Sequence, residues 1–121
     1  MAELHDTGKK GEQIACDFLS KKGYTILETN WRFSHAEIDI IAKEKETLIF
    51  VEVKTRSSDF FGQPEEFINE KKEKLIADAA SEYMKQVNHE WECRFDFISI
   101  ILTRSSHQVR HIEDAFFPGL E

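Results

Sequence analysis

The sequence predicts an α/β protein in which helices flank one mixed β-sheet. Two long segments, residues 7–22 and 69–87, have apolar side chains at helical spacing. Five shorter segments rich in β-branched and aromatic residues lie between and after them. The resulting order, α-β-β-β-α-β-β, is typical of a mixed sheet with helices packed against it.

Length and composition restrict the class of protein further. A chain of 121 residues with 40% hydrophobic and 32% charged residues fits a single domain, residues 1–121, with a core of its own. The longest apolar run, residues 97–102, is too short to span a bilayer, and the N-terminus lacks the order of a signal peptide, so we expect a cytoplasmic protein without membrane contact. The two cysteines lack metal-binding spacing and are expected to be reduced. A net charge of −7 argues against a broad basic surface for nucleic acid, so any such contact must be local.

The first helix is expected to begin at Asp6 or Thr7 as N-cap and to run to about Lys22, with Gly23 ending it. Its apolar stripe predicts the side of the helix that packs on the sheet. The stripe consists of Ile14, Ala15, Phe18 and Leu19.

Three strands are expected next. Residues 24–30 form the first, with Tyr24, Ile26 and Leu27 as candidates for burial, and residues 31–35 connect it to the second. Residues 37–43 and 47–56 form a hairpin, and the β-branched density of its second strand favours a central position in the sheet.

The rest of the chain predicts a loop, a helix and two strands. Residues 57–64 form a loop beside the hairpin, which either positions substrate or is a plain crossover. A helix from Asn69 as N-cap to Val87 follows, and its inward face has seven members. These are Leu75, Ile76, Ala79, Ala80, Tyr83, Met84 and Val87. Strands at 93–102 and 108–113 precede a tail that contains Phe116 and Phe117.

Charged residues interrupt the apolar hairpin strands. Residues two apart share one face of a strand, so Glu37 points with Asp39, and Glu52 points with Lys54. A loop centred between residues 45 and 46 pairs residues whose numbers sum to 91, which places Asp39 opposite Glu52 and Glu37 opposite Lys54. Two carboxylates at such a cross-strand distance repel by roughly 3 kcal/mol at an effective dielectric near 20.

Two interpretations of this cluster remain open. Asp39 and Glu52 could supply oxygen ligands to Mg²⁺ or Mn²⁺, with Lys54 holding a water or a phosphate oxygen nearby. Alternatively, Glu37 and Lys54 form a cross-strand salt bridge on a solvated face, and the other two acids are merely exposed. Glu12 lies at the edge of the first helix's apolar stripe, so it could reach the sheet rim, or it could only complement the helix dipole.

Motifs along nearly the whole chain resemble those of the YraN-like family of uncharacterised bacterial proteins. That family is similar to the PD-(D/E)XK, or restriction-endonuclease-like, superfamily, and in particular to archaeal Holliday-junction resolvases. The matching segments are Thr7-Gly8-Lys9-Lys10-Gly11-Glu12, Asn30-Trp31-Arg32, Glu37-Ile38-Asp39-Ile40-Ile41-Ala42, Phe50-Val51-Glu52-Val53-Lys54-Thr55-Arg56, Phe61-Gly62, residues 71–79 and Arg94-Phe95-Asp96.

The resemblance implies an αβββαβ core with a metal site on the second and third strands. By resemblance, Asp39 and Glu52 take the places of the two acidic metal ligands, Lys54 that of the catalytic lysine, and Glu12 that of an acid contributed by the first helix. The carbonyl of Val53 would be a further ligand.

Further positions around this core complete the expectation. Glu37 would support the ligands or be linked to the metal, and Arg56 and Lys71 would contact phosphate, the latter at a helix N-terminus.

The leading hypothesis is therefore a metal-dependent nuclease-like protein acting on nucleic acid, and on branched DNA if the resolvase resemblance extends to the substrate. The alternatives are a non-catalytic nucleic-acid-binding or scaffold module with the same fold, and an interaction protein in which the carboxylates are only paired charges. A homodimer formed through the last strand and the Phe116-Phe117 segment is also expected from the resemblance, although a tail that caps the core explains the same residues.

Overall fold

The computed structural model describes the backbone of residues 2–57 and 70–115 and the side chains of residues 8–57 and 71–115. Within these residues the elements are α1 (Ala2–Lys21), β1 (Thr25–Phe33), β2 (Ala36–Glu44), β3 (Thr47–Ser57), α2 (Glu70–Gln86), β4 (Cys93–Leu102) and β5 (His107–Ile112). This order confirms the predicted α/β class. The expected loop beyond Ser57, the Asn69 cap and the Phe116-Phe117 contact lie outside the described residues.

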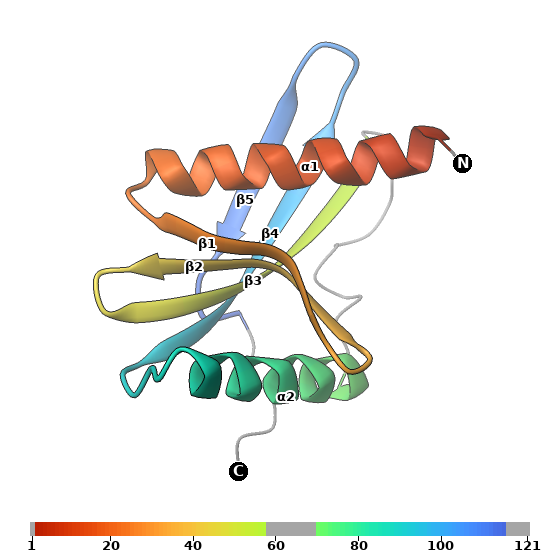
Figure 1. Ribbon diagram of the computed structural model, residues 1–121. Helices are drawn as coiled ribbons and strands as arrows, with labels where there is room; N and C mark the ends of the chain where they lie inside the picture. Colours follow the sequence, from red (N-terminus) through yellow and green to blue (C-terminus); the bar gives the residue numbers. More distant parts are fainter. Residues whose placement is uncertain (1, 58–69, 116–121) are drawn as a thin grey trace.

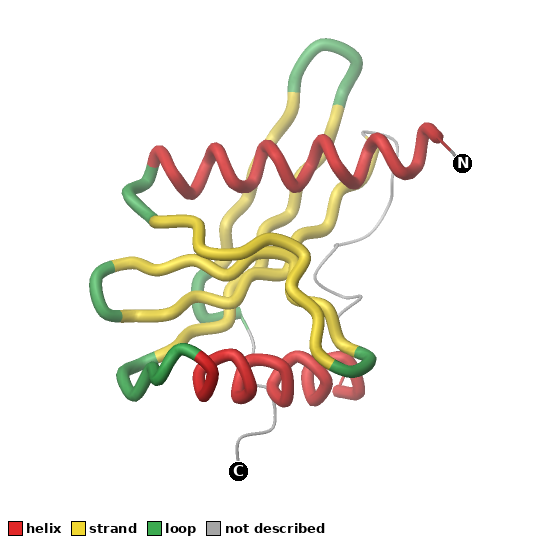
Figure 2. The backbone as a smooth tube through the Cα atoms, viewed as in Figure 1, coloured by secondary structure: helices red, strands yellow, loops and turns green. Residues whose placement is uncertain are grey.

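The sheet has the strand order β1-β2-β3-β4-β5, so β3 is central as predicted. Neighbouring strands are antiparallel except β3 and β4, which are parallel and require the crossover that contains α2. Figure 1 shows the sheet between α1 and α2, and Figure 2 shows the turn of the β4–β5 hairpin extending past α1.

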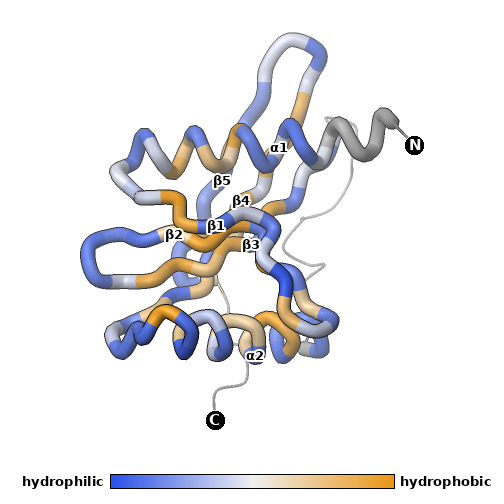
Figure 3. The backbone as a smooth tube through the Cα atoms, in the orientation of Figure 1, coloured by the Kyte–Doolittle hydropathy of each residue, from blue (hydrophilic) through white to orange (hydrophobic). Residues whose placement is uncertain are grey.

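Two core clusters lie on opposite faces of the sheet. Leu48 and Phe50 of β3 pack with α2, whereas Ile49 and Val51 pack with α1. The hydropathy colours in Figure 3 follow this pattern, with hydrophobic residues along the middle strands and hydrophilic ones at the β2–β3 turn. Because side chains alternate between the two faces along β3, Glu52, Lys54 and Arg56 lie on the α2 face.

In the N-terminal half, two predicted boundaries and one predicted burial were wrong. α1 begins at Ala2 rather than at Asp6 or Thr7, because residues that favour caps can also lie inside a helix when the preceding residues continue it. β1 continues to Phe33 through the expected connection, because residues 31–33 pair with β2. Leu27 is 39% exposed, since the β1–β2 register shifts between residues 26 and 28.

The end of α2 also differs from the prediction. The helix ends at Gln86, and Val87 is 48% exposed instead of joining the core. Asn88 has a left-handed φ of 55°, and its N–H bonds to the Lys85 carbonyl at 3.2 Å while the His89 N–H bonds to the Met84 carbonyl at 2.9 Å. This is how a helix commonly terminates, and it turns the last apolar residue outward.

A buried polar network joins β4 to β5 and to the start of β1. Asp96 has no exposed surface and accepts two hydrogen bonds from Arg94, at 2.8 and 2.9 Å, one from His111 Nε2 at 2.7 Å and one from the Asp114 N–H at 3.0 Å. Burial alone would raise the pKa of Asp96, but these hydrogen bonds hold it below its ordinary value. The same Arg94 bonds to the Tyr24 hydroxyl at 2.7 Å, so the network ties three strand regions together.

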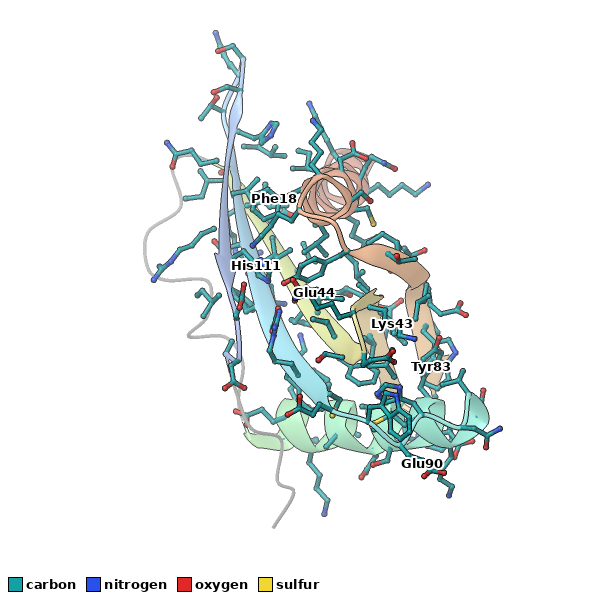
Figure 4. All side chains as sticks on the ribbon, turned by 90° about the vertical axis from the view of Figure 1, so that its left-hand side faces the viewer. Phe18, Lys43, Glu44, Tyr83, Glu90 and His111 are labelled. Atoms are coloured by element: carbon teal, nitrogen blue, oxygen red, sulfur yellow. The ribbon has the colours of Figure 1, made fainter. Side chains whose placement is uncertain are left out.

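The rings around this network pack on α1. Figure 4 shows Phe18 of α1 and His111 of β5 facing each other, and their ring centroids are 6.0 Å apart in an edge-on arrangement. Both cysteines are free, as predicted. Within residues 2–57 and 70–115, neither helix has the length and apolar character needed to cross a membrane.

Candidate functional site

The candidate site forms where β2 and β3 separate. The predicted register, in which paired residue numbers sum to 91, holds from Glu44–Thr47 to Ile40–Val51. Beyond that point the β1–β2 hairpin bends toward α2 while β3 continues toward the N-terminal half of α1 (Figure 1). A gap therefore opens at the level of the two acids.

Asp39 bridges the start of this gap. Its Oδ2 accepts a hydrogen bond of 2.8 Å from the backbone N–H of Val53. The N–H and C=O of one residue in an extended strand point to the same edge, so the Val53 carbonyl also points toward β2. The carboxylate of Asp39 and this carbonyl consequently face the same opening.

Glu52 lies on the α2 face of β3 and is only 5% exposed. Its Oε2 forms an ion pair with the ammonium of Lys72, whose side chain is 33% exposed and comes from the first turn of α2. A buried carboxylate requires a partner because burial penalises its charge. Lys72 is that partner in this structure, although the sequence analysis assigned it no role.

A cavity of about 380 Å³ lies between the sheet and the N-terminal end of α2. Both acids line it, and Lys72 lines it from the helix side. Its lining residues are His35, Ala36, Glu37, Asp39, Glu52, Lys71, Lys72, Leu75 and Ile76. The cavity thus combines carboxylates on one wall with ammonium groups on the other.

The acids influence one another strongly. Burial, and then the nearby charge of Glu52, raise the pKa of Asp39 from 3.8 to about 8, while the Val53 N–H and Lys72 oppose the shift. Glu12 also raises this pKa by its charge, so it lies within electrostatic range of Asp39. Asp39 is therefore an acid that keeps its proton to a much higher pH than an ordinary carboxyl group, mainly because it is buried.

The two lysines respond in opposite directions. Partial burial, and then the adjacent Lys72 ammonium, lower the pKa of Lys54. Burial also opposes the charge of Lys72, but its hydrogen bond to Glu52 and the charge of that carboxylate raise the Lys72 pKa overall. Lys54 is thereby the more readily deprotonated amine at the site.

Glu12 is positioned by a close approach of α1 to β3. A side chain at Gly11 would overlap the Thr55 hydroxyl, so only glycine allows the helix to lie this near the strand. Glu12 then accepts a hydrogen bond of 3.1 Å from the Asn30 side-chain amide on β1, whose φ is 52°. It influences Asp39 from the α1 side and does not line the cavity described above.

The remaining predicted residues have mixed placements. Glu37 lines the cavity, but the predicted pairing with Lys54 is wrong: it lies opposite Arg32 of β1 and forms an ion pair with that guanidinium at 3.5 Å. Arg56 donates to the neighbouring Thr55 carbonyl at 3.0 Å and adds positive charge near Lys54. Lys71 is exposed at the cavity rim, where a phosphate could reach it.

The oxygen donors at the site suit the divalent ion that the family resemblance implies. Among the described residues, no three side chains of the His, Cys, Asp and Glu types converge tightly enough to form a metal cluster by themselves. Two carboxylates and one backbone carbonyl facing one opening are oxygen donors of the kind Mg²⁺ and Mn²⁺ prefer, and these ions retain waters at the remaining positions. Burial, and then the charge of Glu52, raise the pKa of Asp39, and a bound cation would oppose both effects. The residues therefore fit such an ion if Lys72 leaves Glu52.

Comparison with known protein families gives a direct assignment. The model of the uncharacterised protein family UPF0102 matches residues 11–100. The chain belongs to this family. The matched UPF0102 region contains every residue named at the site, from Glu12 to Lys72, and its description states no activity.

Relatives of similar length carry the same family description. A UPF0102 protein of Flavobacterium psychrophilum is 49% identical over 117 residues, covering 97% of this chain and 98% of the relative. A UPF0102 protein of Parabacteroides distasonis is 44% identical, covering 97% of this chain and 97% of the relative. A UPF0102 protein of Thermodesulfovibrio yellowstonii is 43% identical, covering 93% of this chain and 96% of the relative. The YraN-like resemblance is thus confirmed at the level of the family.

Proposed function

We propose that this UPF0102 protein is a metal-dependent nuclease that hydrolyses phosphodiester bonds in nucleic acid. The observation that carries the proposal is the pair of Asp39 and Glu52, held together on the α2 side of the sheet with Lys54 two residues further along β3. An acid pair in a partly buried cavity is costly in a purely structural role, because each charge disfavours the other.

Each residue has a role in this reaction. Asp39, Glu52 and the carbonyl of Val53 would hold Mg²⁺ or Mn²⁺, with Glu12 assisting from α1. The bound ion would lower the pKa of a coordinated water and neutralise charge on the phosphate. Lys54, whose pKa is lowered, holds the attacking water or a phosphate oxygen by hydrogen bonding.

Substrate binding is proposed to be local. Lys71, at the N-terminal end of α2, lines the cavity, and Arg56 near the end of β3 adds positive charge beside Lys54. A helix N-terminus presents free N–H groups and a positive dipole end, which favour a phosphate. This arrangement offers a short cationic track on a chain whose net charge is −7, and branched DNA is the first substrate to test because of the resolvase resemblance.

A second candidate is a nucleic-acid-binding or scaffold module without turnover. It is favoured by the ion pair between Lys72 and Glu52, which satisfies one metal-ligand candidate without any ion. In that case the cavity would still bind phosphate but would lack a cation.

The first experiment measures cation binding. Isothermal titration with Mn²⁺ and thermal unfolding in Mn²⁺ are compared for wild type, for Asp39→Asn with Glu52→Gln, and for a control with two exposed acids replaced, Asp78→Asn with Glu90→Gln. We expect Mn²⁺ to bind and stabilise wild type and the control but not the site double variant. If Mn²⁺ shifts none of the three proteins, the cation site is refuted.

The second experiment separates the enzyme from the binding module. Wild type and Lys54→Ala are incubated in Mn²⁺ with branched, flapped and single-stranded DNA and with RNA, and an exposed-lysine variant, Lys85→Ala, serves as the control. Loss of a general acid–base group costs about 10²–10⁴-fold in rate. Cleavage that survives Lys54→Ala would contradict the mechanism, whereas binding without cleavage by wild type would favour the second candidate.

A further inference from the structure

The first turns of α2 carry several lysines, although the N-terminal end of a helix disfavours cations. The helix begins at Glu70, and Lys71, Lys72 and Lys74 follow at once. The helix dipole places partial positive charge at this end, so an ammonium group there needs a compensating partner or solvent. Lys71 and Lys74 are exposed to solvent, whereas Lys72 turns inward.

Lys72 reaches the most buried carboxylate of the site. Its ammonium contacts Glu52, which is 5% exposed, and a hydrogen bond and the charge of that carboxylate raise the Lys72 pKa. It also lies beside Lys54, so two ammonium groups share one small region. The carboxylate of Glu52 supplies the opposing charge that makes this juxtaposition stable.

A bound divalent ion and Lys72 cannot both hold Glu52 in the same way. The ammonium contacts Oε2 of Glu52, which lines the cavity, and a divalent cation next to the ammonium groups of Lys72 and Lys54 would be repelled. Entry of the ion therefore requires the ammonium to leave. The four-carbon stem of lysine allows that movement without a shift of the helix.

We propose that Lys72 is the resident counter-ion of Glu52, that a divalent cation displaces it, and that the displaced ammonium then binds the substrate phosphate. The inference rests on the proposed function, because it assumes that the acid pair binds a cation. It adds a substrate-binding residue from α2 and explains how the cavity stays neutralised before the ion arrives.

The position of Lys72 supports the second half of this proposal. Once released, its ammonium remains at the cavity wall that Lys71 also lines, and it stays near Lys54 of β3. A phosphodiester entering along the N-terminal end of α2 would meet Lys71 and Lys72 at this wall. Lys72 contacts Glu52, so it lies next to the place where the ion would bind.

The test begins with cation affinity in the absence of substrate. Mn²⁺ is titrated into wild type, Lys72→Met, Lys72→Arg and the control Lys74→Met, which removes an exposed lysine from the same helix. Removing a competing charge-assisted hydrogen bond should tighten Mn²⁺ binding roughly tenfold in Lys72→Met. Lys74→Met should match wild type, and Lys72→Arg, which keeps the competing charge, should show no such gain.

The outcomes separate this inference from the proposed function. If wild type binds Mn²⁺ and Lys72→Met binds it no more tightly, the counter-ion role is overturned while the nuclease proposal stands. If neither protein binds Mn²⁺, the cation site itself is refuted, and both proposals fall. Binding by Lys72→Met alone would support the counter-ion role directly.

Thermal unfolding guards against a folding defect in the variant. In EDTA, Lys72→Met should unfold at a lower temperature than wild type at neutral pH, because Glu52 loses its counter-ion. Saturating Mn²⁺ should restore it and give a larger shift than in wild type. If Mn²⁺ does not restore the unfolding temperature of Lys72→Met, the ion pair of Lys72 with Glu52 has only a structural role.

The phosphate role is tested without turnover. Binding of a fluorescent four-way DNA junction is measured in Ca²⁺ for wild type, Lys72→Met and Lys74→Met. Loss of one phosphate contact should weaken binding several-fold and reduce the salt dependence by about one unit in the slope. Equal affinity and equal slope for Lys72→Met and Lys74→Met would overturn this part of the inference.

Discussion

The stability of the cation-free protein should fall with rising pH because of one carboxyl group. Burial and the nearby Glu52 raise the pKa of Asp39 from 3.8 to about 8 in the folded chain. Between these two values the folded state holds a proton that the unfolded state has lost, so raising the pH favours unfolding. The Asp39→Asn variant lacks this titration and should not lose stability for the same reason.

The expected size follows from the proton linkage. One proton changes the free energy of unfolding by about 1.4 kcal/mol per pH unit, so wild type should lose about 3 kcal/mol relative to Asp39→Asn between pH 5 and pH 7. For a chain of this length that corresponds to roughly 10 °C in melting temperature. Asp39→Asn should therefore be the more stable protein at pH 7.

Urea denaturation in EDTA at pH 5, 6 and 7 measures the effect. Asp78→Asn, which changes an exposed acid on α2, is the matched control and should follow wild type. A difference between wild type and Asp39→Asn that stays constant over this range would refute the reasoning. It would show that Asp39 titrates like a solvated carboxyl and that burial and the charge of Glu52 do not raise its pKa.

Three further predictions use other parts of the structure. Gly11→Ala should destabilise the protein by about 1–3 kcal/mol in urea denaturation, because the added methyl group overlaps with Thr55 of β3. The control Gly8→Ala, where a side chain meets no atom within 4 Å, should be neutral or stabilising. Equal effects of the two substitutions would contradict the close approach of α1 to β3. Asp96→Asn should cost about 3 kcal/mol at pH 7. Because the pKa of Asp96 is lowered in the fold, the advantage of wild type should begin to shrink as the pH falls below the unfolded value near 4, and a difference that grows with acidification would argue against the network. Glu12→Gln should lower the pKa of Asp39, so the pH-dependent loss of stability should be complete at a lower pH than in wild type when the urea series is extended to pH 9. An unchanged profile would separate Glu12 from the site.

The hairpin shows what the sequence could predict. The register was correct from Glu44–Thr47 to Ile40–Val51 because a two-residue loop fixes pairing in a hairpin, and Lys45 has the left-handed φ, 54°, that such loops require. The proximity of the acids followed from that register and from the two-residue period of a strand.

The residue at which the β2–β3 pairing ends could not be predicted in the same way. The pairing ends at Ile40–Val51 because the β1–β2 hairpin bends toward α2, and this bend depends on how the hairpin packs rather than on the β2–β3 pair. Glu37 accordingly pairs with Arg32 on β1 instead of with Lys54. Local periodicity contains no information on where two strands part.

Lys72 was missed for a related reason. A lysine run at a helix start is usually solvated, and only the position of α2 over β3 shows that one of its members reaches Glu52. The sequence did hold one signal, since cations at a helix N-terminus oppose the helix dipole. The residues that the family resemblance assigned lie on β2, β3 and α1, whereas this partner comes from α2.

The central claim is that Asp39 and Glu52 form a cation site from which Lys72 must withdraw. A crystal structure of the wild-type protein grown in Mn²⁺, with anomalous scattering recorded for manganese, tests it most directly. We expect an anomalous peak between the two carboxylates, within about 2.0–2.3 Å of their oxygens, and a Lys72 ammonium no longer in contact with Glu52. A Lys72–Glu52 ion pair that persists in saturating Mn²⁺, with no peak between the acids, would contradict it.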